Sequence, residues 1–152
     1  MPPRLEFTVF ADYNQFFVLD DELEPQYPES ISQSAIDDRC QVQPSILAVY
    51  TAFPREVAVG IRVCDNIPDI AGGCWAHVIR GAFAIPSGQL VLAGCSDYLP
   101  DCPRIQVPRG MLEFLLCGRG FDAQAQEKYL LALWPGQFRL VEVVKRHVAH
   151  DG

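Results

Sequence analysis

Glu-Val-Ala-Val-Gly-Ile-Arg-Val-Cys, residues 56–64, is the stretch that decides the fold class. Its branched apolar side chains occupy every second position, namely Val57, Val59, Ile61 and Val63. Successive side chains of a β-strand point to opposite faces, so this alternation predicts a strand with one face in a core. A helix would need apolar positions three and four residues apart, and the stretch does not have that spacing.

Comparable apolar stretches recur along the chain at roughly ten-residue intervals, the rhythm of all-β folds. They lie at 5–11, 15–19, 45–52, 75–85, 89–96, 110–118, 127–134 and 137–145. Two of them, 112–117 and 129–134, are apolar on both faces, which predicts strands at the centre of the core. The expected fold is therefore all-β: an antiparallel β-sandwich or barrel of about ten strands. We expect residues 1–152 to form a single β-sandwich domain.

Two pairs of these strands are expected to be neighbours through short connections. Residues 5–11 and 15–19 are separated by Asp-Tyr-Asn and predict a hairpin or a bent strand. Residues 127–134 and 137–145 are joined by Pro135-Gly136, a turn pair that predicts a second hairpin.

One short helix is expected over residues 31–39. Ser30 and Gln33 have the spacing of a capping box, in which the serine caps the helix and the glutamine reaches back. The loop before it, 20–29, is acidic and carries two prolines, so we expect it to be exposed.

Charge is distributed very unevenly. The chain carries a net −7, and residues 1–39 alone hold nine acids against two bases, whereas the remainder is neutral. Such a field repels nucleic acid and anionic membranes and attracts basic proteins. The acids predicted to contact a partner are Asp20, Asp21, Glu22, Glu24, Asp37 and Asp38. The alternative is that this charge serves solubility alone.

No pattern indicates catalysis, a metal or a cofactor. There is no G-x-S-x-G elbow, no phosphate-binding glycine loop and no EF-hand spacing. His147 and His150 have no convincing third ligand near them. Cys74 and His77 are three residues apart, which on a strand places them on opposite faces and argues against a dyad. A non-catalytic protein is the expectation.

Six cysteines are present without any C-x-x-C pair, so we expect buried free thiols. Cys95 and Cys102, which flank a proline-containing loop, are the pair most open to another role. The start of the chain lacks the apolar core of a secretory signal, and no apolar run approaches the roughly 18 residues of a membrane span. A cytoplasmic location without membrane contact is therefore expected.

Several short stretches resemble the competence protein J family, small bacterial proteins described as inhibitors of a DNA-entry nuclease. They are Tyr-Asn-Gln-Phe-Phe-Val at 13–18, Ala-Ile-Asp-Asp at 35–38 continuing into Ser-Ile-Leu at 45–47, the strand–Val-Pro-Arg-Gly–strand pattern of 105–115, and Leu-Trp-Pro at 133–135. The resemblance spans about residues 5–145. The six cysteines and the proline loops at 65–74 and 97–104 depart from it.

The resemblance implies a nuclease inhibitor, and the charge pattern implies a basic partner. Together they favour a binding protein that docks its acidic N-terminal surface on a nuclease. One alternative is a β-sandwich or barrel that binds a small molecule, with Trp75, Trp134, Tyr98 and the Gly72-Gly73 loop around the pocket, unless both tryptophans are core. The other is a structural module that self-associates through a sheet face or edge.

Overall fold

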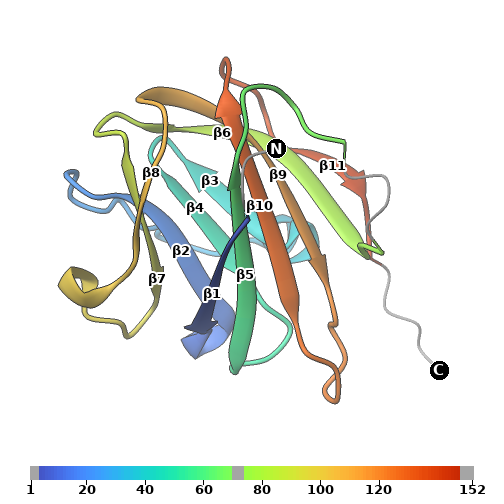
Figure 1. Ribbon diagram of the computed structural model, residues 1–152. Helices are drawn as coiled ribbons and strands as arrows, with labels where there is room; N and C mark the ends of the chain where they lie inside the picture. The colour runs from blue at the N-terminus through green and yellow to red at the C-terminus, as the bar shows by residue number, and fades with distance from the viewer. Residues whose placement is uncertain (1–3, 70–73, 148–152) are drawn as a thin grey trace.

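Two β-sheets pack face to face in the computed structural model, which describes residues 4–69 and 74–147 (Figure 1). Sheet A has the order β1-β5-β10-β9-β6-β11. Its strands are Leu5–Phe10 (β1), Glu56–Val63 (β5), His77–Ile85 (β6), Gly110–Arg119 (β9), Lys128–Pro135 (β10) and Glu142–Lys145 (β11). Sheet B has the order β3-β4-β2-β7-β8. Its strands are Gln15–Asp20 (β2), Cys40–Gln43 (β3), Ile46–Tyr50 (β4), Gln89–Gly94 (β7) and Arg104–Gln106 (β8).

Both sheets are open, with edge strands β1 and β11 in sheet A and β3 and β8 in sheet B. The all-β prediction is confirmed in its sandwich form. The alternating residues of β5 behave as expected, because Val57, Val59 and Ile61 are buried between the sheets. The two stretches expected at the centre are β9 and β10, which lie side by side inside sheet A. The short strands β3 and β8 were not predicted.

Residues 5–11 and 15–19, predicted to form a hairpin or a bent strand, form two separate strands, β1 and β2, that do not pair with each other. β1 pairs with β5 in sheet A, and β2 lies between β4 and β7 in sheet B. The chain crosses from one sheet to the other through a 3-10 turn at Asp12–Asn14. Both hydrogen-bonding edges of β2 are occupied by sheet B strands, which leaves no edge for β1.

The hairpin predicted at Pro135-Gly136 is also wrong. β10 is flanked by β5 on one side and β9 on the other, so both of its edges are taken. The chain instead passes over the sheet and adds β11 to the free edge of β6. On this crossing Arg139 pairs with Glu113 of β9 at 3.3 Å.

The pairing of β5 with β10 is parallel, whereas every other strand pair in the two sheets is antiparallel. The helix α1 (Gln33–Asp38) lies within the predicted range but starts later. The capping box predicted for Ser30 and Gln33 is wrong. The cap is Ser32, whose hydroxyl accepts a 3.1 Å hydrogen bond from the Ala35 N–H, and the Gln33 amide donates forward to the Asp37 carboxylate at 2.9 Å. No helix in the described part of the chain is long and apolar enough to cross a bilayer.

Candidate partner-binding surface

The outer face of sheet B is covered by the acidic segment that joins β2 to β3. Phe17, Ala48 and Val91 belong to a second apolar cluster on this face, outside the main core. Tyr27 packs edge-on against Phe17 with 4.9 Å between ring centroids, and Ala35 of α1 is buried in the same cluster. These contacts hold residues 21–38 onto the sheet. The loop expected to be exposed therefore also covers apolar side chains on the outer face of sheet B.

Asp20 lies apart from the other predicted contact acids because it is buried, with only 4% of its surface exposed. Its carboxylate accepts backbone hydrogen bonds from the N–H groups of Glu22 at 2.8 Å, Leu23 at 3.2 Å and Ser87 at 2.9 Å. A carboxylate that satisfies three backbone donors organises the turn around it. Asp20 therefore fixes the start of the cover segment and is not available as a surface contact.

The other three predicted acids of residues 20–24 are accessible to solvent. Asp21 is half-buried and its carboxylate pairs with the Arg104 guanidinium of β8 at 3.0 Å. Glu22 and Glu24 are exposed and have no ion-pair partner among the residues that the structure describes. Their charge remains uncompensated at the surface.

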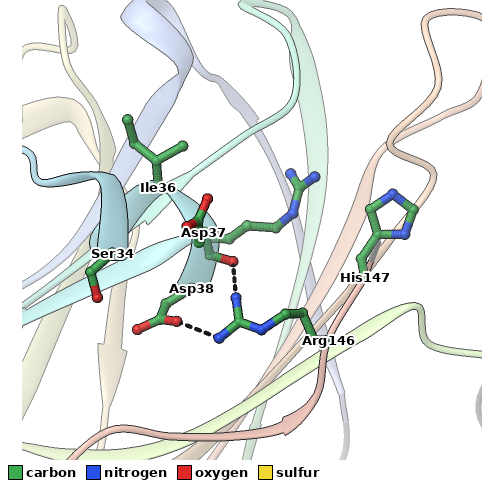
Figure 2. Close-up of a pocket in the computed structure, with 7 residues that line it drawn as sticks. Ser34, Ile36, Asp37, Asp38, Arg146 and His147 are labelled. Atoms are coloured by element: carbon green, nitrogen blue, oxygen red, sulfur yellow. Dashed lines mark hydrogen bonds and ion pairs between the residues drawn. The ribbon is translucent and has the colours of Figure 1, made fainter. Parts of the chain in front are cut away.

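Asp37 and Asp38 end α1, where the C-terminal strand comes close (Figure 2). The Arg146 guanidinium donates to the backbone carbonyl of Asp37 at 2.7 Å and to the Asp38 carboxylate at 2.8 Å. These residues, with Ser34, Ile36, Arg39 and His147, line a hollow of about 640 Å³. These hydrogen bonds hold Arg146 against the end of α1. Residues 148–152, including His150, lie outside the described residues.

The structure does not bring the six predicted acids to one spot. Cys40, which follows α1, pairs with Val49 of β4, and Val49 also pairs with Phe16 near the start of β2. Asp20 is the last residue of β2. Four residues of strand separate these positions, or about 13 Å along the sheet. The 20–24 group and the 37–38 group therefore lie at opposite ends of sheet B.

A second acidic segment lies over the same sheet and was not recognised from the sequence. Residues 95–102 follow β7 and pack Leu99 and Cys102 onto the outer cluster of sheet B. Together the two covering segments, 21–38 and 95–102, hold eight acids and no base. These are Asp21, Glu22, Glu24, Glu29, Asp37, Asp38, Asp97 and Asp101. The acidic surface thus extends over most of sheet B, and we call it the acidic cover.

His77 is buried beneath the end of α1, and both of its ring nitrogens are hydrogen-bonded to backbone groups. Its Nδ1 accepts a 3.0 Å hydrogen bond from the His147 N–H, so its Nε2 carries the proton and donates to the Asp38 carbonyl at 2.8 Å. Burial, followed by the nearby charges of Arg39 and Arg146, holds the pKa of His77 below its ordinary value. Nowhere in residues 4–69 or 74–147 do three His, Cys, Asp or Glu side chains gather to hold a metal ion.

The cysteines differ in exposure, and Cys102 is half-buried. Cys40, Cys64 and Cys117 are buried free thiols, as predicted, and burial raises the pKa of Cys40 and of Cys117 to about 12. Cys74 and Cys95 are exposed, which differs from the prediction. Cys95 directly follows the last residue of β7 and so leaves the sheet.

A buried polar network around Glu127 was not predicted from the sequence. Glu127, fully buried before β10, pairs with Arg55 at 3.2 Å and accepts from the Ala52 N–H at 2.9 Å and from the Tyr129 hydroxyl. Burial and the Glu127 charge raise the pKa of Tyr129 well above its ordinary value. The network ties the β4–β5 crossover to the β9–β10 loop, because Arg55 also donates to the Gly120 carbonyl.

The residues proposed for a small-molecule pocket are not gathered. Trp75 and Trp134 are buried in a third apolar cluster on the outer face of sheet A, and both are core. Tyr98 is exposed on the acidic cover of sheet B. Gly72 and Gly73 lie outside the described residues.

No protein-family model and no curated protein matches this chain. Two solved structures share its fold. ComJ from Bacillus subtilis, an inhibitor of the DNA degrading activity of NucA, superposes with a TM-score of 0.71 at 9% identity, covering 88% of this chain and 98% of that one. The product of crocagin biosynthetic gene J superposes at 0.67 with 13% identity, covering 90% and 99%. The resemblance to the competence protein J family is confirmed at the level of the fold, and identities this low show the fold alone.

Proposed function

We propose that this chain is a non-catalytic binding protein that inhibits a nuclease by docking the acidic cover of sheet B on the enzyme's basic cleft. The observation that carries the proposal is the charge of that cover, with eight acids and no base in residues 21–38 and 95–102. The shared fold with an inhibitor of a DNA-degrading activity supports the same role.

The chemistry of a nuclease makes such a surface effective. A nuclease holds DNA through its phosphates, which requires a cleft rich in lysine and arginine. A protein surface covered by carboxylates presents negative charge to that cleft, as the DNA phosphates do. Complementary charge accelerates association, and occupation of the cleft excludes DNA.

The carboxylates that face solvent without a cation are best placed for this contact. Within residues 21–38, Glu22, Glu24, Glu29 and Asp37 make no ion pair with the described part of the chain. Asp21 and Asp38 are already paired with Arg104 and Arg146, so they would exchange one cation for another. We therefore expect the four unpaired acids of this segment to contribute more binding free energy than its two paired ones.

The test is a plasmid-degradation assay with nuclease activity from the source cells, and separately with NucA. The quadruple variant E22Q/E24Q/E29Q/D37N should protect DNA about 30-fold less well at low salt, from roughly 0.5 kcal/mol for each exposed ion pair. A matched control neutralises four acids on or directly beside strands of sheet A, E6Q/E56Q/D65N/E142Q. The proposal fails if both variants protect DNA as well as the original chain, or if the original chain protects it from neither source.

A further inference from the structure

A groove runs along the exposed side of α1, at the end of the sandwich where β1 crosses to β2. It has a volume of about 530 Å³. Its main apolar walls are Tyr13, Ile31, Ile36, Tyr50, Phe53 and Phe121. We call it the α1 groove.

Three of these walls present large apolar side chains to solvent. Tyr13 is 74% exposed, Ile31 47% and Ile36 49%. Single exposed apolar residues are ordinary on protein surfaces, but several around one hollow mark an interaction site. Tyrosine is also a residue type enriched among those that dominate binding energy.

The groove is built on fixed backbone. Tyr13 and Asn14 adopt left-handed conformations, with φ of 57° and 61°. The Asn14 side-chain amide donates to the Ala52 carbonyl at 3.2 Å, and the Thr51 N–H donates to the Asn14 carbonyl at 2.8 Å. These bonds fix the backbone that carries Tyr13 before any partner arrives, which lowers the entropy cost of binding.

The opposite wall is equally constrained. Arg39 caps α1 in the left-handed region with φ of 62°, and its guanidinium lies 3.9 Å from the centroid of the Phe121 ring. Phe121 also contacts the His147 ring at 4.9 Å between centroids. A stack of this kind presents a rigid surface rather than a mobile loop.

The groove continues on both sides. A hollow of about 620 Å³ shares Ile31 and Tyr50 with it and extends to Tyr27 and Cys95. The hollow of Figure 2 shares Ile36 and Arg39 with it and ends at Arg146. The combined surface can hold an extended or helical segment of a partner as well as one side chain.

The charges bordering the groove determine which partner fits. Asp12, Glu29 and Asp37 stand near it, and none of the three pairs with a cation in the portion of the chain described. Two of the nearby cations are paired, Arg146 with Asp38 and Arg55 with the buried Glu127. The third, Arg39, stacks on Phe121 and pairs with no carboxylate in the described residues, so three unpaired acids face one uncompensated cation.

We infer that the α1 groove is the apolar anchor point of the interface. It receives an aliphatic or aromatic side chain that a basic protein presents between lysine or arginine residues. This inference rests on the proposed function, because it locates the centre of that contact, and it adds an apolar requirement that charge alone does not impose. Unpaired carboxylates around an apolar centre form the polar rim and buried core typical of specific interfaces.

The experiment replaces the two isoleucines without changing charge. I31S/I36S should weaken inhibition of the nuclease about tenfold or more and should leave its salt dependence unchanged, since the lost contacts are apolar. The matched control, L140S/V144S, removes two exposed apolar side chains carried by the sheet A side of the molecule. Circular dichroism and urea unfolding confirm that both variants remain folded.

A second readout does not depend on nuclease inhibition. A photo-crosslinking phenylalanine analogue is placed at Tyr13, or at Phe138 as the control, in the source cells, and crosslinked proteins are identified by mass spectrometry. A basic protein captured from Tyr13 and not from Phe138, and lost in the I31S/I36S background, supports the groove even if no nuclease is inhibited. Crosslinks to a second copy of this chain, or none at Tyr13, overturn the inference. Full inhibition by I31S/I36S overturns it while leaving the proposed function standing.

Discussion

Replacing Asp20 by alanine separates a structural acid from a surface acid within the same run of charge. The carboxylate of Asp20 accepts three backbone hydrogen bonds, from Glu22, Leu23 and Ser87, at 2.8–3.2 Å. Hydrogen bonds to a charged group contribute about 1.5 kcal/mol each at the lower end of their range, so three give roughly 4.5 kcal/mol. Glu22 and Leu23 are exposed, and water can replace part of this loss. We expect Asp20→Ala to lower the free energy of unfolding by about 3 kcal/mol.

Urea unfolding followed by tryptophan fluorescence measures this loss. With an m-value of about 2 kcal/mol/M, the midpoint should move by about 1.5 M. Asp20→Asn keeps one acceptor oxygen and should lose roughly half as much. The matched control is Glu22→Ala, which removes an exposed acid two residues away and should change stability by less than about 0.5 kcal/mol. Equal midpoints for Asp20→Ala and Glu22→Ala would refute the structural role assigned to Asp20.

Three further predictions concern buried groups. Glu127→Gln should destabilise the chain by about 3 kcal/mol, because it leaves the Arg55 guanidinium half-buried without its counter-charge, and thermal unfolding would detect this. The free energy of unfolding should fall as pH drops below 6.5. Because the pKa of His77 is lowered in the folded chain, the unfolded chain binds a proton at this histidine at a higher pH than the folded chain does. This contribution is complete above 6.5, and His77→Gln should remove up to about 1.4 kcal/mol per pH unit from the slope of unfolding free energy against pH. The exposed Cys74 should react with a thiol reagent within minutes, whereas Cys117, with a pKa raised to about 12, should react only on unfolding; mass spectrometry of modified peptides would distinguish them.

Local sequence patterns predicted where the strands lie better than they predicted which strands pair with each other. Alternation in β5 and two-sided apolarity in β9 and β10 depend on burial, which the residues themselves encode. The turn at Pro135-Gly136 has the composition of a hairpin, yet β10 already has partners on both edges. Which edges remain free depends on the whole sheet, and no short stretch carries that information.

The candidate surface was predicted in part for a similar reason. A run of acids indicates charge but does not reveal which carboxylate turns inward, and Asp20 does so because backbone donors from two turns converge on it. Asp97 and Asp101 are far from residues 21–38 in sequence, so only the packing of both segments on sheet B brings them into one cover. Glu127 is an isolated acid before a strand, and its burial follows from Arg55, 72 residues away.

The parallel pairing of β5 with β10 delays completion of sheet A during synthesis. Every strand of sheet B has been synthesised once residue 106 is added, whereas the centre of sheet A needs β10, which ends at Pro135. At about 5–20 residues per second, those 29 residues take roughly 1.5–6 s. During that interval the inner face of sheet B lacks most of its partner, and β5 waits with one edge unpaired. The growing chain is therefore exposed to aggregation until β10 emerges, and a chain interrupted before β10 should be found with chaperones rather than folded.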